Sequence, residues 1–292
     1  MSRETWQQFL ASQTPATAER DRACVADLPM LAAVRFHGPD ARKFLQGYLT
    51  CDTDDLTPHQ LTATAVCNLK GRVVITGWAT ARADGDVRLI LHHSLVGALQ
   101  AFLAPYLRFS RTRLLEEQDA VLVLGGLNLP AEAGCLPAIA ALSIYLTEDA
   151  AAAGALWQRY PQVTAEAWLA ALTEAGMPVI SARVSERFLP QMLDLDRLGA
   201  VDFAKGCYLG QEVVARAQHR GAVKRHLRQL RWQGQQAPAA GVELIDAAGT
   251  AAGTVVQSAT SEPGHGPALA VMQPDRTGPF HPAGQEGDLR LV

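Results

Sequence analysis

A single cysteine between two glycines is the feature of this sequence with the clearest chemical use. Cys207 lies in residues 205–212, KGCYLGQE, two residues after Lys205 and just before a segment of helical character. A thiol acts as a nucleophile or ligand only as thiolate, and a nearby cation and a helix N-terminus both lower its pKa. Glycine lets the backbone turn tightly and approach a ligand closely. The run predicts a functional thiol at Cys207 assisted by Lys205; the alternative is a small buried cysteine in a tight turn.

The segment that follows the cysteine is strongly basic. Glu212, Arg216 and Arg220 are spaced four residues apart and form one polar stripe of the predicted helix 211–219. Residues 205–231 contain seven Lys or Arg and one acid, whereas the whole chain has a net charge of −3. This asymmetry favours an anionic ligand or partner. The alternatives are an exposed helix with a Glu-to-Arg pair and a solvated basic face.

Trp168 and Glu174 form a second candidate site. The indole could stack on a flat heteroaromatic ligand, with the Glu174 carboxylate accepting hydrogen bonds from ring N–H groups. A tryptophan in such a segment can equally be part of the core. The histidines show no metal-ligand spacing, and the sequence contains no phosphate-binding loop, no dinucleotide-binding glycine motif and no nucleophile elbow.

The sequence predicts that these residues lie in a region of mixed helices and strands, followed by a region of short strands. Residues 1–23 look like a short polar helix or a loose arm. After them we expect strands at 31–36, 61–67, 72–81, 87–92, 120–124 and 143–147, and helices after Pro39 and at 94–103, 149–159 and 164–175. Pro105 is expected to end the helix at 94–103. Five short strand candidates after 221, separated by Gly/Pro-rich turns, predict a small β-barrel or sandwich.

The bulk composition is that of an ordinary globular protein. The 292 residues are 48% apolar and 19% charged, which allows two or three cores. The five cysteines are scattered and form no C-x-x-C pair, which excludes a zinc ribbon or a thioredoxin-like motif. Neither a signal peptide nor a transmembrane span is evident. The sequence predicts a cytoplasmic protein with reduced thiols, no resident metal and no membrane partner.

Taken together, the motifs resemble those of the YgfZ family of folate-binding proteins, which are related to the glycine cleavage T protein, an aminomethyltransferase. The resemblance rests on 205–212 and on flanking matches spread from about 31 to 272. The flanking matches are 38–40, 44–47, Thr50, Asp52, Cys67, 70–72, 168–169, 174–178, 189–191, 215–216 and 220–221. The 205–212 run is the most specific of them.

The resemblance implies an α+β fold with two ferredoxin-like-type α+β portions forming a folate-binding core and a C-terminal β-barrel. We place an arm at 1–23, the core portions at 24–118 and 119–221, and the barrel at 222–292. The implied cofactor is tetrahydrofolate or a one-carbon derivative, and the implied role is the assembly or repair of iron–sulfur client proteins, which affects tRNA modification indirectly. Cys207 and Lys205 are the candidate functional residues. The candidate folate-binding residues are Trp168, Glu174, Tyr208, Gln211, Glu212 and Arg216.

Two departures from the related sequences bear on mechanism. Leu31 stands where folate-binding relatives can carry a second tryptophan. The turn 68–71 is followed by Arg72 and 73–76, with no carboxylate where aminomethyltransferases carry a catalytic aspartate. Turnover by the T-protein route is therefore not expected, although a one-carbon transferase using Glu174 or Asp52 remains the alternative. A module that binds tRNA directly through the basic run is the weakest of the three hypotheses, because no aromatic residues are interleaved with the charges.

Overall fold

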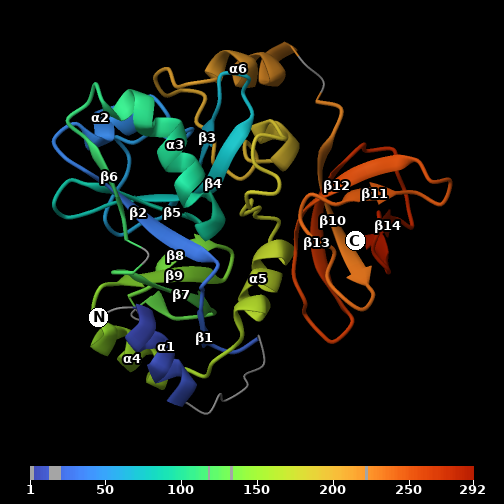
Figure 1. Cartoon of the computed structure of the whole chain (residues 1–292), viewed down its shortest axis with the longest axis horizontal. Coiled ribbons are helices and arrows are strands. Elements are labelled where there is room, and N and C mark those ends of the chain that lie inside the picture. Colours follow the sequence, from blue (N-terminus) through green and yellow to red (C-terminus); the bar gives the residue numbers. More distant parts are fainter. Residues whose placement is uncertain (1–2, 13–20, 118, 132–133, 221–222) are drawn as a thin grey trace. The chain divides into compact units, whose positions relative to one another are not determined.

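The computed structural model describes residues 3–12, 21–117, 119–131, 134–220 and 223–292 (Figure 1). The chain forms two compact units that interleave in sequence. The first comprises Met1–Phe44, Asp54–Thr62 and Trp78–Trp168, and the second comprises Leu45–Thr53, Ala63–Gly77 and Leu169–Val292. Strand β4 (Val73–Ala81) belongs to both. Among the described residues, no helix has the length and apolar character needed to cross a membrane.

A five-stranded sheet has the order β3-β4-β5-β2-β6. Its remaining strands are β2 (Leu31–His37), β3 (Thr62–Cys67), β5 (Val87–His92) and β6 (Arg113–Glu116). All residues of β4 are buried, as expected for a strand covered on both faces. Helix α2 (Ala41–Gln46) follows β2, and the 3-10 turn η1 (His93–Leu95) leads into α3 (Val96–Leu107). The prediction that Pro105 ends this helix is wrong, because α3 continues through Pro105 to Leu107 at the loss of one helical hydrogen bond.

The first unit also contains a four-stranded antiparallel sheet, in the order β1-β7-β9-β8. Its strands are β1 (Cys24–Asp27), β7 (Leu122–Leu127), β8 (Leu136–Ile139) and β9 (Leu142–Thr147), and helices α1 (Arg3–Ser12) and α4 (Ala150–Arg159) pack beside it (Figure 1). The Trp6 and Trp157 rings meet edge to face at 5.8 Å. The Trp6 indole N–H donates to the Asp27 carboxylate at 3.1 Å. The N-terminal segment is therefore anchored as a helix over 3–12, not held as a loose arm.

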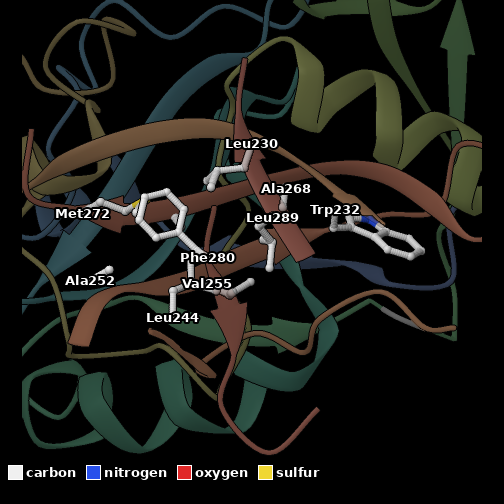
Figure 2. Packing of buried hydrophobic residues seen from close by; sticks show 10 residues of the cluster. Leu230, Trp232, Leu244, Ala252, Val255, Ala268, Met272, Phe280 and Leu289 are labelled. Carbon is white, nitrogen blue, oxygen red and sulfur yellow. The ribbon is translucent and has the colours of Figure 1, made fainter. Parts of the chain in front are cut away.

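The C-terminal part of the second unit is a closed six-stranded barrel with the order β14-β11-β12-β13-β10-β15. The strands are β10 (His226–Gln233), β11 (Glu243–Ile245), β12 (Ala251–Ser258), β13 (His265–Met272), β14 (His281–Pro282) and β15 (Asp288–Leu291). Phe280 and Leu289 exchange two backbone hydrogen bonds that close it. Along β10, Leu230 and Trp232 alternate with exposed residues and point into the core with Phe280 and Leu289 (Figure 2).

Three short helices of the second unit complete the fold: α5 (Ala165–Glu174), most of which belongs to that unit, the 3-10 helix η3 (Pro190–Leu193) and α6 (Gln211–Arg220). The Gln257 amide of β12 donates to the Thr173 hydroxyl at 2.8 Å and accepts from the Val179 N–H at 2.9 Å. Both amide groups of this buried side chain are thus satisfied. The predicted α+β class with a C-terminal β-barrel is confirmed, whereas the predicted domain boundaries stay a prediction.

Candidate functional site: an anchored loop that exposes Cys207

The loop that carries Cys207 packs on the turn between β3 and β4. Gly210 has φ +83°, and a Cβ there would come within 2.3 Å of the Asn68 carbonyl oxygen. The Leu209 N–H donates to the Gly47 carbonyl at 2.9 Å. Glycine at 210 is therefore required both by the left-handed backbone and by the close approach of the turn. Cys207 itself is exposed and carries a free thiol.

The buried side chain of Lys205 anchors this loop to the backbone of a neighbouring segment. Its side chain is only 7% exposed. Its ammonium donates to the backbone carbonyls of Gln46, Leu49 and Cys51 at 2.9, 2.7 and 2.7 Å. Gln46 is the last residue of α2, where carbonyls lack helical partners and carry partial negative charge. The three N–H donors of the ammonium match three acceptors, so Lys205 fixes the loop against the segment that follows α2.

Tyr208 points into the protein beside the anchored ammonium. Its ring centroid lies 5.4 Å from Lys205 Nζ, and the residue is 6% exposed. Burial, with a smaller contribution from Cys67, raises the pKa of the phenol above its usual value. The hydroxyl has no hydrogen-bond partner among the described residues. Burial likewise raises the pKa of the Cys67 thiol to about 12, so at neutral pH both groups are protonated.

Gln211, Glu212 and Arg216 lie in α6, the helix that follows the loop. The Gln211 side-chain carbonyl accepts a hydrogen bond from the Tyr208 N–H at 3.2 Å and so links the loop to the first turn of α6. Glu212 and Arg216 are exposed, one turn apart. The inner face of α6 is held by Gln191, whose amide donates to the Val214 carbonyl at 2.8 Å. The sequence therefore brings Cys207, Lys205, Tyr208 and Gln211 together in one loop, with Glu212 and Arg216 at its rim.

Trp168 lies in the core of the first unit. It is fully buried, and its indole N–H donates to the Gly126 carbonyl at 3.3 Å. A Cβ at Gly125 would come within 2.5 Å of the indole nitrogen, so glycine there makes room for the ring. This is the arrangement that the sequence left open as an alternative to ligand stacking. Contact between Trp168 and a pterin stays a prediction, and it requires the ring to be uncovered when ligand binds.

Glu174, the last residue of α5, faces the barrel. Its carboxylate lies 3.7 Å from the Arg231 guanidinium of β10, and its backbone carbonyl accepts from the Gln229 amide at 3.0 Å. The side chain is 41% exposed, so this ion pair is solvated and contributes little to stability. A ligand that binds Glu174 would compete with Arg231.

Exposed apolar side chains lie at the rim of this loop, and the sequence did not predict them. Leu69 is 72% exposed in the turn on which the loop packs, and Val213 is 37% exposed on α6. Val213 lies against Gly71, where a Cβ would be 2.9 Å from the valine Cβ. The sequence places Leu69 only in the turn 68–71 and Val213 only in the predicted helix 211–219. Their exposure depends on how the turn and the helix pack, which no local pattern reveals.

The comparisons with known proteins place the chain in a family. It matches no family model. It is 34% identical over 262 residues to the tRNA-modifying protein YgfZ of Klebsiella pneumoniae, covering 79% of this chain and 78% of that protein. The chain belongs to the YgfZ family. YgfZ proteins of Cronobacter sakazakii and Escherichia coli O157:H7 are 33% and 32% identical over 260 residues each, again covering 79% of this chain and 78% of theirs.

The fold of this YgfZ family member is also that of a solved enzyme. The crystal structure of the glycine cleavage system aminomethyltransferase T from Bartonella henselae matches with a TM-score of 0.65 at 16% identity, covering 92% of this chain and 84% of the other. At that identity the similarity establishes the shared fold. The predicted family is confirmed, and the T protein shares the fold of this chain.

Proposed function

We propose that this YgfZ family member is a folate-binding accessory protein that acts in the cytoplasm in assembling or repairing iron–sulfur enzymes. Its effect on tRNA modification would be indirect, through those client enzymes. The observation that carries the proposal is an exposed thiol, Cys207, on a loop that a buried lysine anchors and that packs closely on the β3–β4 turn at Gly210. The relatives are named tRNA-modifying proteins, and this supports the proposed effect on tRNA modification.

The surroundings of Cys207 suit contact with another protein. Buried cysteines of this chain have thiols whose pKa is raised by burial, as at Cys24 and Cys67, and these are inert. Cys207 is exposed instead. Exposed apolar side chains, Leu69 and Val213, flank the turn and helix that frame the loop. A solvent-facing thiol beside exposed apolar surface is what a transient contact with a client protein requires.

The cofactor we propose is tetrahydrofolate, which would accept a one-carbon unit when bound, or a one-carbon derivative, which would supply one. The buried Tyr208 hydroxyl, without a hydrogen-bond partner among the described residues, fits a ligand with polar ring atoms. Gln211 and Glu212 offer further polar groups at the same loop. Trp168 and Glu174 can contact this ligand only if the Trp168 indole is uncovered and the ion pair between Glu174 and Arg231 opens.

Aminomethyl transfer by the route of the T protein has less support. The turn after β3 places Arg72, not a carboxylate, at its end, and the Arg72 guanidinium donates to the Arg187 carbonyl at 2.9 Å. The Asn68 side-chain oxygen accepts from the N–H groups of Lys70 and Arg72, so it shapes the turn. A cation at this position cannot protonate a departing amine as a carboxylic acid does.

Calorimetric titration with tetrahydrofolate tests the proposal, together with an assay for one-carbon transfer to amine acceptors. We expect saturable binding without turnover, weakened about tenfold in Tyr208→Phe if the phenol donates a hydrogen bond to the ligand. Turnover that is lost in Glu174→Gln would favour the transferase. Absence of binding would remove the folate part of the proposal and leave Cys207 as the thiol of a protein-interaction factor.

A further inference from the structure

The second unit contains a cavity of about 570 Å³ that the thiol site does not use. It is lined by Arg72, Arg187, Phe188, Leu189, Met192, Ala217, Val223, Lys224 and Arg225. Its walls therefore come from the turn after β3, the segment around η3, α6 and the approach to β10. Four of the nine lining residues are cations and the other five are apolar. Its volume lies within the range of pockets that hold small organic ligands.

The two arginines of the cavity are held in place by backbone acceptors. The Arg72 guanidinium donates to the Arg187 carbonyl at 2.9 Å, and the Arg187 guanidinium donates to the Gly241 carbonyl at 3.0 Å. A Cβ at Gly241 would lie 3.3 Å from the Arg187 nitrogen, so a glycine there gives the guanidinium room. The Arg72 guanidinium also lies 4.0 Å from the Met192 sulfur. Each guanidinium has five N–H donors, so these bonds leave others available. The arginines are therefore preorganised cations.

The charge at the cavity is uncompensated. No acidic side chain lines it, and within the described ranges none of its four cations forms an ion pair with a carboxylate. Lys224 and Arg225 are exposed and complete the rim. In a chain of net charge −3, four unpaired cations around one hollow attract anions strongly. Guanidinium groups in particular match the planar geometry of carboxylate and phosphate.

The floor of the cavity is apolar. Phe188 is 5% exposed and lies under the Arg187 guanidinium, 5.9 Å from ring centroid to the central carbon. Leu189 and Met192 are half-buried beside it. These side chains offer apolar surface to the uncharged part of a ligand, and a thioether adapts its shape to what it meets.

We propose that this cavity binds a small organic anion, whose carboxylate or phosphate groups the four cations hold and whose apolar body covers Phe188, Leu189 and Met192. Carboxylate and phosphate ligands share this chemistry, and the experiment separates them. The proposal does not depend on Cys207 or on folate binding. The cavity shares α6 and the turn after β3 with the Cys207 loop, since Gly71 contacts Val213 and Ala217 follows Val213 by one helical turn.

The test is calorimetric titration of the full chain with three probes: inorganic phosphate, phenyl phosphate and phthalate. We expect phenyl phosphate or phthalate to bind several-fold more tightly than inorganic phosphate, and the tighter of the two identifies the anion class. Arg187→Gln and Lys224→Gln should each weaken that binding about tenfold. The matched control is Arg228→Gln, which removes a charge from the same basic run but does not line the cavity.

Three results would overturn the proposal. One is the absence of binding by all three probes at millimolar concentration. Another is equal affinity for phosphate and phenyl phosphate, which would show that the apolar floor takes no part. The third is an equal loss of affinity in Arg228→Gln, which would show general attraction by the basic run and no site. Thermal unfolding of each variant without probe identifies any loss of folding, and the Lys224 variant keeps the test valid if Arg187→Gln is unstable, because Lys224 is exposed.

Discussion

The largest change in stability that we predict is for a substitution at Lys205. Lys205→Met keeps the length and apolar stem of the side chain but removes the ammonium that donates to three backbone carbonyls at 2.7–2.9 Å. Hydrogen bonds from a charged group contribute about 1.5 kcal/mol each, or about 4.5 kcal/mol for three. Relief of the buried charge offsets about a third of this, so we expect the free energy of unfolding to fall by about 3 kcal/mol.

Urea denaturation of the intact chain, followed by circular dichroism, measures this difference. Lys224→Met is the matched control, since Lys224 is exposed and the same substitution there should change the free energy of unfolding by less than about 0.5 kcal/mol. If Lys205→Met is as stable as this control, Lys205 does not anchor the loop. The prediction from the sequence, in which the lysine acts on the Cys207 thiol, would then be favoured.

Three further outcomes follow from the site. Iodoacetamide should label Cys207 and leave Cys67 unlabelled even at pH 9, because burial raises the pKa of the Cys67 thiol to about 12 and keeps it protonated. Early labelling of Cys67, detected by mass spectrometry, would contradict this prediction. Gly210→Ala should lower the free energy of unfolding, measured in urea, by at least about 2 kcal/mol, whereas Gly206→Ala should not, because Gly206 has open space around it. Equal losses in the two variants would refute the close approach of Gly210 to the Asn68 carbonyl. Tetrahydrofolate should quench tryptophan fluorescence, and Trp168→Phe should remove most of the quenching; unchanged quenching would show that another tryptophan meets the ligand.

The strands and the barrel were predictable because their signals are local. Alternation along β10 and the turn residues between short strands suffice to indicate a barrel, and Gly176, with φ +76°, ends α5 as a helix-terminating glycine should. The helix runs two residues past Pro105, because the loss of one backbone hydrogen bond there does not end it, and no local pattern reveals this. Strand β1 was missed, since its four residues show no alternation and its place depends on pairing with β7.

The site was only partly predictable because its key contacts are distant in sequence. The run 205–212 identified Cys207, but the partners of Lys205 lie more than 150 residues away, so its anchoring role was not visible. The burial of Trp168 depends on Gly125 and Gly126, more than 40 residues upstream. The basic run suggested an anion site, but its cavity also needs Arg72 and Arg187, which no spacing connects to Lys224.

The central claim is that Cys207 is the functional thiol of a protein that supports iron–sulfur enzymes. The most direct measurement is complementation of a bacterial strain that lacks its own YgfZ protein, with methylthiolated tRNA as the readout. Cys207→Ser should fail to restore the modification while its folding and most of its tetrahydrofolate affinity stay intact, and Cys135→Ser, a change at the half-buried free thiol, should restore it. Full restoration by Cys207→Ser would contradict the account.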